Sequence, residues 1–432
     1  MEKRVRVLIN TLKPSTSETI LIRGWIYRLR ELARTTFIVL KDCTGEIQCV
    51  ADTSAWRHLN LKLEMPVEII GQIKNEPRSP SGLELELKDI TALNEVSLTL
   101  PFNSSSNISE VGIDTLLTYR ALSLRNEQVG DIFKIQAAIL QYLRQFLQER
   151  HFTEIITSKI VSSGTEGGTS LFAIKYFERS AYLAQSPQFY KEHGVAGLER
   201  VFETGHVYRA EPHASSRHLT EYCSLDLEMG FIDGPEEVIQ LERELLTFIF
   251  EQINENYVAL LKRHNREPLP SMLTVPIWEF ADCLQKLKDN FGRDDLIDDL
   301  DPLAERQLCE IAKKETNIAA VFVIGFPLSG RPFYTHPRGD RGAAESFDLL
   351  FEGLEITTGG QRLHRRSDLE NALEKRSINP ESFEDHLRMF EIGMPPHGGL
   401  AIGLERLTAQ ILHLSNVRQA TLYPRDRYRI SP

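Results

Sequence analysis

The sequence predicts a two-domain α+β protein, with a small N-terminal β-barrel followed by a larger domain built on antiparallel strands. Two observations predict this class. Residues 19–94 contain only short β-rich stretches, whereas the chain beyond residue 129 mixes long strands with helices. The strands and helices of the second part do not alternate as βαβ units would, which favours α+β over a parallel α/β fold.

Five short stretches between residues 19 and 94 are rich in β-forming residues, and Gly or Pro separates them. They are TILIRGWIYRL, TFIVLKD, EIQCVAD, PVEIIGQI and LELELKDI. Five strands in so short a segment are typical of a closed barrel, and the OB-fold is the natural candidate. Another small barrel or a sandwich would show the same pattern. We assign residues 1–100 to this domain.

A polar, low-complexity stretch, NSSSN at residues 103–107, predicts a hinge or linker over residues 101–128. Apolar residues then recur at helical spacing from Val129 to Leu147. Residues 129–432 show no further linker and are assigned to one domain. Its expected strands include RVFETGHVYRAE, EYCSLDLEMGFI, AAVFVIGFP and FDLLFEGLEITTG, with helices near 236–262 and 380–391.

Composition excludes several classes of protein. The 432 residues are 41% hydrophobic and 26% charged, and no run of about 18 apolar residues could cross a membrane. No apolar signal segment is recognisable, and five scattered cysteines without a CxxC pair argue against a zinc site or a disulfide framework. These features predict a cytoplasmic protein. The net charge of −11 conceals a basic N-terminal end, with nine Lys and Arg against three Asp and Glu over residues 1–41.

The segment RAEPHASSRHLTEY, residues 209–222, lies between two expected strands and predicts a hairpin with a long tip. Arg209 and Arg217 offer planar guanidinium groups that suit phosphate or carboxylate oxygens. A salt-bridged surface hairpin would contain the same residues, so this segment alone does not establish a site.

A second group of polar residues follows at 348–364. Asp348 and Glu355 are carboxylates of the kind that Mg²⁺ uses together with substrate phosphates. Seven positions separate them, so a regular strand would point them to opposite faces. A bulge or a turn at Gly353 would be needed to bring them together. Structural carboxylates remain an equal alternative on spacing alone.

The segment PPHGGLAIGLERLTAQIL, residues 395–412, passes from glycines into a helix that is expected to begin near Ala401. Arg406 would lie in its first turns, where the helix dipole disfavours a cation unless an anion meets it. A helix-surface arginine is the simpler alternative. A Gly-rich loop at 162–172, followed by AQSPQFYK, would be either a lid or an ordinary surface loop. Neither a P-loop nor a Rossmann glycine motif is present.

Together these segments resemble the aspartyl-tRNA synthetases of the archaeal and eukaryotic type, a group of class II aminoacyl-tRNA synthetases. RAE…RHLTEY and GLERL look like motifs 2 and 3 of that class, and TEGGTSLF…AQSPQFYK and residues 346–364 resemble the same family in the same order. The resemblance spans the whole chain. It implies a class II catalytic domain with an antiparallel sheet and an N-terminal anticodon-binding OB-fold.

The resemblance implies an aspartate–tRNA ligase. ATP would convert L-aspartate to aspartyl-adenylate, and the aspartyl group would pass to the 3′ end of tRNA(Asp), with tRNA(Asn) as an open second acceptor. A homodimer is also implied, although Ser158 stands where the first motif of the family has its interface proline. No side chain is required as a general base.

Residue roles follow from the resemblance. ATP would contact Arg209, Glu211, Arg217, His218, Leu219, Tyr222, Glu355, Gly403 and Arg406, with Arg209 and Arg406 catalytic. Mg²⁺ would be held by Asp348, Glu355 and Thr358. L-Aspartate would contact Glu166, Gln188, Lys191, Arg209, Asp226, Thr358 and Arg362. Lys191 and Arg362 would meet its side-chain carboxylate, and asparagine would leave these two cations unpaired at a cost in free energy.

In the barrel, Phe37 matches an aromatic residue that stacks on an anticodon base, and Gln48 matches a base-reading amide. Arg23, Arg28 and Lys41 are expected near tRNA phosphates. A place in the barrel core is the alternative for Phe37.

Three other functions are compatible with the sequence. They are an asparaginyl-tRNA synthetase, a synthetase-like paralogue with an RNA-binding or regulatory role, and an enzyme that activates aspartate for a purpose other than protein synthesis. Pyrophosphate exchange with each amino acid and charging of tRNA distinguish them.

Overall fold

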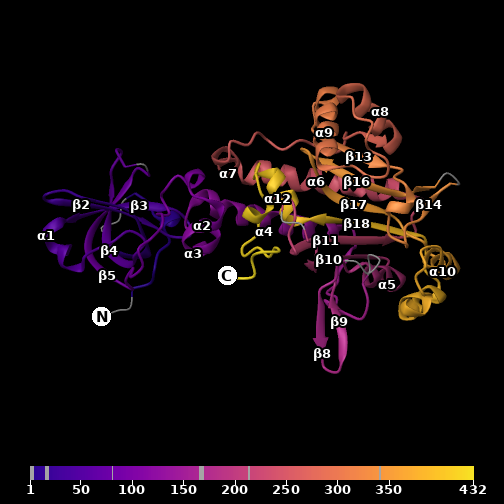
Figure 1. The fold of residues 1–432 in the computed structure, drawn as a ribbon. Helices are drawn as coiled ribbons and strands as arrows, with labels where there is room; N and C mark the ends of the chain where they lie inside the picture. The colour runs from indigo at the N-terminus through magenta and orange to yellow at the C-terminus, as the bar shows by residue number, and fades with distance from the viewer. Residues whose placement is uncertain (1–3, 15–18, 80, 165–169, 213–214, 340–341) are drawn as a thin grey trace. The chain divides into compact units, whose positions relative to one another are not determined.

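The fold is that of a computed structural model, which describes residues 4–14, 19–79, 81–164, 170–212, 215–339 and 342–432. The chain divides into two compact units, Met1–Gly130 and Asp131–Pro432 (Figure 1). Within the described residues, every helix is too short or too polar to span a bilayer.

The first unit contains a closed barrel with the strand order β1–β2–β3–β5–β4. Its strands are β1 (Thr19–Glu31), β2 (Thr35–Lys41), β3 (Glu46–Asp52), β4 (Pro66–Asn75) and β5 (Leu83–Ala92). Each corresponds to one of the predicted strands. Inward residues alternate with outward ones, so that Ile38 and Leu40 are fully buried while Phe37 and Val39 are only partly buried. The predicted barrel is confirmed.

Residues 101–128, expected to form a hinge, contain η3 (Ile108–Glu110), α2 (Ile113–Thr118) and α3 (Arg120–Ser123). Phe102, Leu116 and Leu122 form a small buried cluster in this segment. The side chain of Asn126 donates to the carbonyl of Ser104 at 2.9 Å. The segment therefore belongs to the first unit, and the division falls after Gly130.

The second unit is organised around a sheet with the strand order β12–β13–β16–β17–β18–β11–β10–β6. The strands are β12 (Ile277–Glu279), β13 (Ala320–Ile324), β16 (Ser346–Phe351), β17 (Leu354–Gln361), β18 (His397–Gly403), β11 (Glu221–Gly230), β10 (Arg200–Tyr208) and β6 (Thr153–Glu154). All pairs from β13 to β10 are antiparallel, and the two outermost pairs are parallel. This sheet confirms the predicted α+β class.

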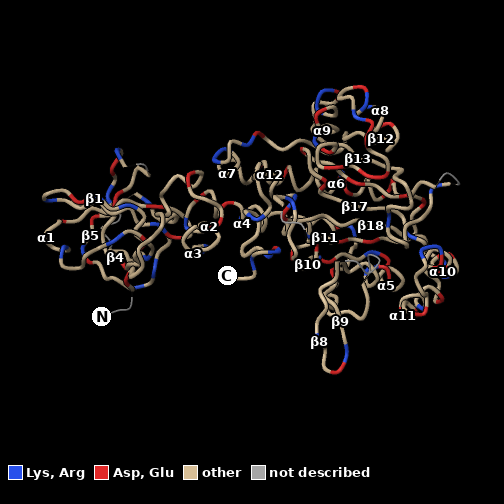
Figure 2. Tube along the Cα trace, in the orientation of Figure 1, with Lys and Arg blue, Asp and Glu red and all other residues tan. Residues whose placement is uncertain are grey.

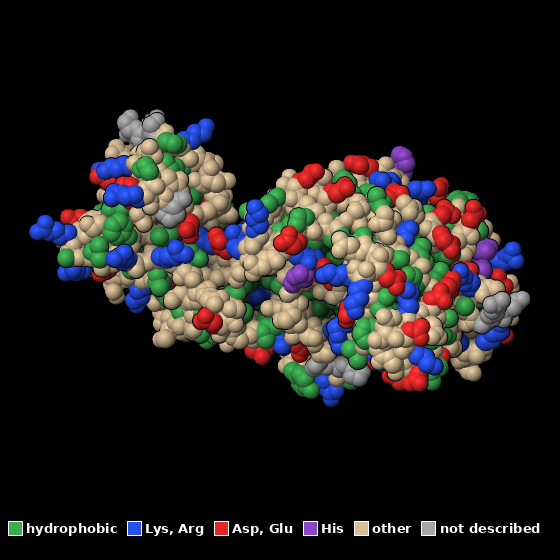
Figure 3. Space-filling view, turned by 90° about the horizontal axis from the view of Figure 1, so that it is seen from above, with side chains coloured by type: hydrophobic (Ala, Val, Ile, Leu, Met, Phe, Trp, Pro, Cys, Tyr) green, Lys and Arg blue, Asp and Glu red, His purple; other side chains and the backbone are tan. Residues whose placement is uncertain are grey.

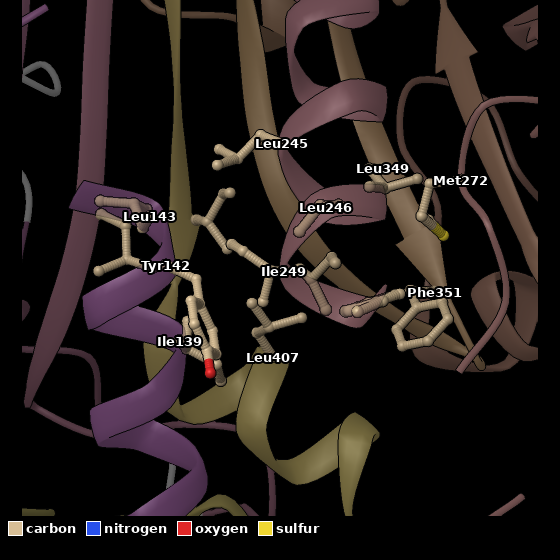
Figure 4. Close-up of a cluster of buried hydrophobic side chains, with 14 of the residues drawn as sticks. Ile139, Tyr142, Leu143, Leu245, Leu246, Ile249, Met272, Leu349, Phe351 and Leu407 are labelled. Atoms are coloured by element: carbon tan, nitrogen blue, oxygen red, sulfur yellow. The ribbon is translucent and has the colours of Figure 1, made fainter. Parts of the chain in front are cut away.

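The main core lies between this sheet and four helices. The helices are α4 (Glu127–Glu149), α6 (Pro235–Asn256), α7 (Val258–Arg263) and α12 (Leu404–Ile411). Figure 4 shows side chains of this cluster from α4, α6 and α12, among them Tyr142, Ile249 and Leu407. Burying one such side chain completely stabilises the fold by about 1.5–3 kcal/mol, so these contacts hold the helices against the sheet, which is the platform of this unit.

The remaining elements lie around this platform. They are α5 (Gln188–Leu198), α8 (Phe280–Phe291), α9 (Pro302–Thr316), α10 (Arg366–Lys375), α11 (Glu384–Leu387), β7 (Ile160–Val161), β8 (Ala173–Tyr176), β9 (Arg179–Leu183), β14 (Pro337–Arg338) and β15 (Ala343–Ala344). The expected helix at 236–262 is present as α6 and α7, and 380–391 folds as short helical turns around α11.

Glu242 of α6 is a buried carboxyl group whose Oε1 accepts a 2.6 Å hydrogen bond from Thr357. Burial raises its pKa to about 8, and the charge of Asp348 adds to this effect. The unfolded chain would release this proton near pH 4.5, whereas the folded chain retains it until about pH 8. The free energy of unfolding therefore falls as pH rises between these two values.

We expect Glu242→Gln to remove this dependence on pH. From pH 5 to pH 8 the free energy of unfolding of the unchanged chain should fall by roughly 3 kcal/mol more than that of the variant. Urea unfolding at both pH values measures it. Glu251→Gln, on the exposed side of α6, is the matched control. Parallel pH profiles for E242Q and the unchanged chain would contradict the assignment.

Candidate active site

A cavity of about 310 Å³ opens beside β11, β17 and the junction of β18 with α12. It is lined by Arg209, Glu211, Arg217, His218, Leu219, Tyr222, Ser224, Glu355, Ile356, Thr358, Ala401, Gly403, Glu405, Arg406 and Val417. Every residue that was predicted to contact ATP is in this lining. Segments that are far apart in the sequence thus form a single cavity.

The hairpin predicted at 209–222 is confirmed, because β10 and β11 pair antiparallel up to Tyr208 and Glu221; residues 213–214 between them lie outside the described part of the chain. The guanidinium of Arg209 lies 5.9 Å from the centre of the Tyr222 ring. Glu211 lies 4.0 Å from Nη1 of Arg209 and 3.8 Å from Nε2 of His218. Burial raises the pKa of Tyr222, so its ring stays neutral and can act as a stacking surface.

Asp348 and Glu355 lie on the neighbouring strands β16 and β17, not on one strand. The chain reverses at Glu352 and Gly353, whose φ values are 51° and 87°, and the pairing register shifts after Leu349. A Cβ at Gly353 would approach the Arg306 side chain to 2.8 Å, so glycine is required there. The turn at Gly353 that was expected between Asp348 and Glu355 is therefore present.

The two carboxylates influence each other. Burial raises the pKa of Asp348 to about 6, and the charge of Glu355 adds to this against the opposing effect of Arg331. Burial would raise the pKa of Glu355 as well, but Arg406, the hydrogen bond from Thr358 and the charges of Arg331 and Arg209 together outweigh it, and the pKa is lowered. At neutral pH both groups can present oxygen anions to the cavity.

The chemical type of these side chains, two carboxylates and a hydroxyl, suits a magnesium site. Both Asp348 oxygens accept from Arg331, at 3.0 and 2.8 Å, and Thr358 Oγ1 donates to Glu355 at 2.9 Å. Mg²⁺ commonly takes one or two carboxylates and completes its shell with phosphate oxygens and water. A cation there would share Asp348 with Arg331. Arg331 was not expected from the sequence.

The helix of the third segment begins at Leu404 and not near Ala401. Residues 397–403 instead form β18, because their backbone groups pair with both β11 and β17. Arg406 lies in the first turn of α12, as predicted, and donates to the carbonyl of Glu355 at 2.9 Å. Its guanidinium is 3.6 Å from the Glu355 carboxylate, which supplies the anion that this position requires.

A buried charge cluster adjoins the sheet at β11. Alternation along this strand sends Leu225 and Leu227 into the core and Asp226 to the opposite face, together with Glu228. Lys191 is 1% exposed, and its Nζ lies 3.1 Å from Asp226, 3.2 Å from Glu228 and 3.2 Å from the carbonyl of Leu400.

Arg362 completes this cluster. Its Nε donates to Glu228 at 3.0 Å and its Nη2 to the carbonyl of Gly399 at 3.1 Å. Burial would lower the pKa of Arg362, but Glu228, Tyr334 and Glu192 together outweigh it and hold the pKa above the usual range. A Cβ at Gly399 would come within 2.3 Å of the Glu228 carboxylate, so only glycine admits this arrangement.

This cluster changes the reason for expecting aspartate rather than asparagine as the substrate. Lys191 and Arg362 already pair with protein carboxylates, so asparagine would not leave them without partners. Protein acceptors surround the Lys191 ammonium, whereas Nη1 of Arg362 meets no acceptor in the described part of the chain. Arg362 is therefore the cation that can donate hydrogen bonds to a ligand, whereas Lys191 holds the carboxylates of Asp226 and Glu228 in place.

Other residues of the site are placed as follows. Gln188 is the first residue of α5 and is 3% exposed. Glu166 lies outside the described residues. Glu305 of α9 pairs with Arg217 and accepts from the backbone N–H of Glu355 at 2.8 Å. The sequence did not suggest Glu305, since α9 lies between the recognisable segments; Glu228, two residues beyond Asp226, was recognisable as a carboxylate but was given no role.

The barrel carries a separate cavity of about 740 Å³ on the outer face of β1–β3. Arg28, Phe37 and Gln48 line it together with Leu29, Arg30, Val39, Glu46, Ile47, Ser79 and Ser81. Because Phe37 faces this cavity, the core alternative for Phe37 is wrong. Figure 3 shows Lys and Arg side chains over the visible face of this unit, and the trace in Figure 2 shows Asp and Glu interspersed among them.

Two predicted barrel residues are engaged elsewhere. Arg23 forms a 2.6 Å ion pair with Glu68. Lys41 lies 4.6 Å from the centre of the Tyr27 ring and 3.6 Å from Glu127. Neither lines the cavity.

Comparison with known proteins agrees with this architecture. A family model described as tRNA synthetases class II (D, K and N) matches residues 112–427, and one described as an OB-fold nucleic acid binding domain matches residues 20–93. The aspartate–tRNA(Asp/Asn) ligase of Thermus thermophilus is 40% identical over 431 residues, covering 99% of this chain and 100% of that protein. The aspartate–tRNA(Asp) ligase of Pyrococcus abyssi is 35% identical over 95% of each chain.

Solved structures include both amino-acid specificities. An asparaginyl-tRNA synthetase from Pyrococcus horikoshii, complexed with asparaginyl-adenylate, matches with a TM-score of 0.92 at 28% identity over 100% of both chains. A putative aspartyl-tRNA synthetase from Leishmania major Friedlin matches with a TM-score of 0.90 at 28% identity, over 100% of this chain and 96% of that one. The fold is thus shared, while the sequence is nearer to the aspartate enzymes. The chain belongs to the class II tRNA synthetases of the D, K and N group and, within it, to the aspartate–tRNA ligases.

Proposed function

We propose that the chain activates L-aspartate with ATP and transfers the aspartyl group to the 3′ ends of both tRNA(Asp) and tRNA(Asn), acting in the cytoplasm as a homodimer. One observation carries the proposal: the arginine-lined cavity at β11, β17 and α12 uses the same strand, β11, as the buried Lys191–Glu228–Arg362 cluster. The second acceptor is supported by relatives such as that of T. thermophilus, which is named for both tRNAs.

The cavity suits adenylate formation. The substrate carboxylate attacks the α-phosphorus in line and pyrophosphate leaves, so negative charge concentrates at that centre. Arg209 and Arg406 would stabilise this charge, while Arg217 and His218 would meet the outer phosphates and Tyr222 the adenine. Cations held in advance at the cavity wall act without a covalent intermediate.

Asp348 and Glu355, with Thr358 beside them, would hold Mg²⁺. A bound Mg²⁺ neutralises phosphate charge and orients the leaving group. The protein contributes hydrogen bonds from Arg331 to Asp348 and from Thr358 to Glu355, which orient the two carboxylates.

Arg362 would bind the side-chain carboxylate of aspartate through the nitrogen that meets no protein acceptor among the described residues. Gln188 and Asp226 would receive the substrate ammonium, together with Glu166. A carboxylate gains a charge-assisted hydrogen bond at Arg362 that an amide nitrogen cannot form.

The homodimer is supported by exposed apolar side chains on the segment where the family's first motif lies. Ile156 is 96% exposed and Ile160 is 47% exposed. A second copy of the chain would remove both from water.

We expect Phe37→Ala to impair tRNA charging and to spare adenylate formation. Loss of one base-stacking ring should reduce kcat/KM for tRNA by about 10- to 100-fold, since stacking contributes about 1–3 kcal/mol. Steady-state charging and pyrophosphate exchange measure the two steps. Leu93→Ala, a barrel residue that is 51% exposed, is the control. Unaltered charging by F37A would remove Phe37 from the interface.

The proposed function is tested by pyrophosphate exchange with aspartate and with asparagine, followed by charging of tRNA(Asp) and tRNA(Asn) transcripts. The proposal requires exchange with aspartate and charging of both tRNAs. Exchange with asparagine alone would identify an asparaginyl-tRNA synthetase. Exchange with aspartate but no charging would indicate another use of the adenylate, and no exchange at all would indicate a paralogue without activation.

A further inference from the structure

Glu192 of α5 is a completely buried carboxylate to which neither the sequence nor the proposed function assigns a role. Its Oε1 accepts a 2.6 Å hydrogen bond from Nε2 of Gln188. Its Oε2 lies 3.5 Å from Nε2 of His386 and 3.9 Å from Nε2 of His397, which are 4% and 0% exposed. The group therefore lies directly behind a residue of the proposed aspartate pocket.

His397 is the histidine that carries the compensating charge. Its Nδ1 lies 2.9 Å from the carbonyl of Pro395, which can only accept, so Nδ1 bears a proton while Nε2 faces Glu192. Burial would lower the pKa of His397, but Glu192, Glu228 and the Pro395 carbonyl together outweigh it and the pKa is raised. The protonated form of the ring is therefore favoured opposite the carboxylate.

His386 is neutral by contrast. Burial lowers its pKa to about 4 in spite of the opposing charge of Glu192, and its Nδ1 shares a 2.9 Å hydrogen bond with Nε2 of His193. Burial would raise the pKa of Glu192 itself, yet the two histidines and Gln188 lower it to about 2. Glu192 is thus an ionised carboxylate, and it can only accept hydrogen bonds.

An acceptor at this position determines which way round the Gln188 amide lies. Only the amide NH₂ can face an ionised carboxylate, so the amide oxygen must point away from Glu192. That oxygen is the atom that can accept from a substrate ammonium. A neutral amide in place of Glu192 would bind Gln188 in either orientation, and one of these would turn an NH₂ group toward the ammonium.

We infer that Glu192 is a positioning residue of the amino-acid pocket: flanked by His397 and His386, it orients the Gln188 amide so that its oxygen receives the substrate ammonium. The inference rests on the proposed function, in which Gln188 contacts the amino acid.

Pyrophosphate exchange with the full-length protein tests this role, using Glu192→Gln, Gln188→Ala and the double variant. E192Q should raise KM for aspartate by about tenfold while KM for ATP stays within about twofold, because only the amino-acid contact is altered. In the Q188A background, E192Q should add less than about twofold, because residues that act through one contact are not additive. Glu199→Gln, exposed at the end of the same helix, is the matched control.

Several results would overturn the role. They are an unchanged KM for aspartate in E192Q, an equal rise of KM for ATP and aspartate, and additive losses in the double variant. If E192Q does not fold, Glu192→Asp is used in its place, because it keeps the negative charge but moves the carboxylate away from the Gln188 amide. The proposal then requires the same selective rise of KM for aspartate and the same lack of additivity with Q188A. Should the chain activate asparagine instead, the proposed function fails, but the coupling is still measurable because both amino acids carry the same ammonium group.

Discussion

Replacing Lys191 or Arg362 by alanine is expected to abolish aspartate-dependent exchange of pyrophosphate into ATP. Each replacement leaves Glu228, which is 0% exposed, without one of its two cations. Removing one partner from a buried ion pair costs roughly 3–5 kcal/mol, and at the pocket this corresponds to a loss of about 10²- to 10³-fold or more. Exchange at varied aspartate concentration, with ATP saturating, is the measurement.

The two variants should differ in how they fail. Both replacements should lower the free energy of unfolding, and Lys191→Ala should lower it more, because the Lys191 ammonium contacts Asp226, Glu228 and the carbonyl of Leu400. Arg362→Lys should fail to restore exchange, because an ammonium cannot bind Glu228, the carbonyl of Gly399 and a ligand together in the same plane. Lys314→Ala and Arg388→Ala, at exposed ion pairs on helices, are the controls. Undiminished exchange by either pocket variant would discard the assignment of this pocket.

Arg209→Ala is expected to lower kcat for exchange by about 10²- to 10³-fold, the usual loss when one preorganised donor to a developing anion is removed. The Arg209 side chain is 41% exposed, and interactions of such solvent-exposed charges contribute little to folding, so the fold should lose little stability. The kinetic loss should therefore occur without a change in Tm.

Exchange kinetics and thermal unfolding of R209A separate the two effects. Arg200→Ala, on the same strand and with a side chain 37% exposed, is the matched control. A loss confined to KM for ATP, with kcat intact, would show that Arg209 serves ground-state binding alone.

The barrel strands and the cavity residues could be predicted because each is recognisable from a short stretch of sequence. The five barrel strands alternate inward and outward residues along their own sequence, so each was recognisable by itself. The cavity residues were found for a similar reason, because motifs 2 and 3 each lie on one hairpin or one strand–helix junction. The start of α12 was misplaced because the Gly-rich residues 397–403 have weak strand preference, and pairing with β11 and β17 decides their conformation.

The ion pairs that organise the site depend on distant partners, and no local pattern predicts them. Arg362 and Glu228 are 134 positions apart, and Arg217 and Glu305 are 88 apart. Glu192 follows Lys191 directly, yet its role emerges only when α11 and β18 bring His386 and His397 beside it. Burial and long-range pairing, which determine these roles, are properties of the folded chain.

The most direct test is to incubate the purified protein with ATP, Mg²⁺ and L-aspartate, quench in acid and measure aspartyl-adenylate by mass spectrometry. We predict a stoichiometric enzyme-bound adenylate with aspartate and none with asparagine. Absence of aspartyl-adenylate, or accumulation of asparaginyl-adenylate in its place, would contradict the claim that this arginine-lined cavity and its buried charge cluster activate aspartate.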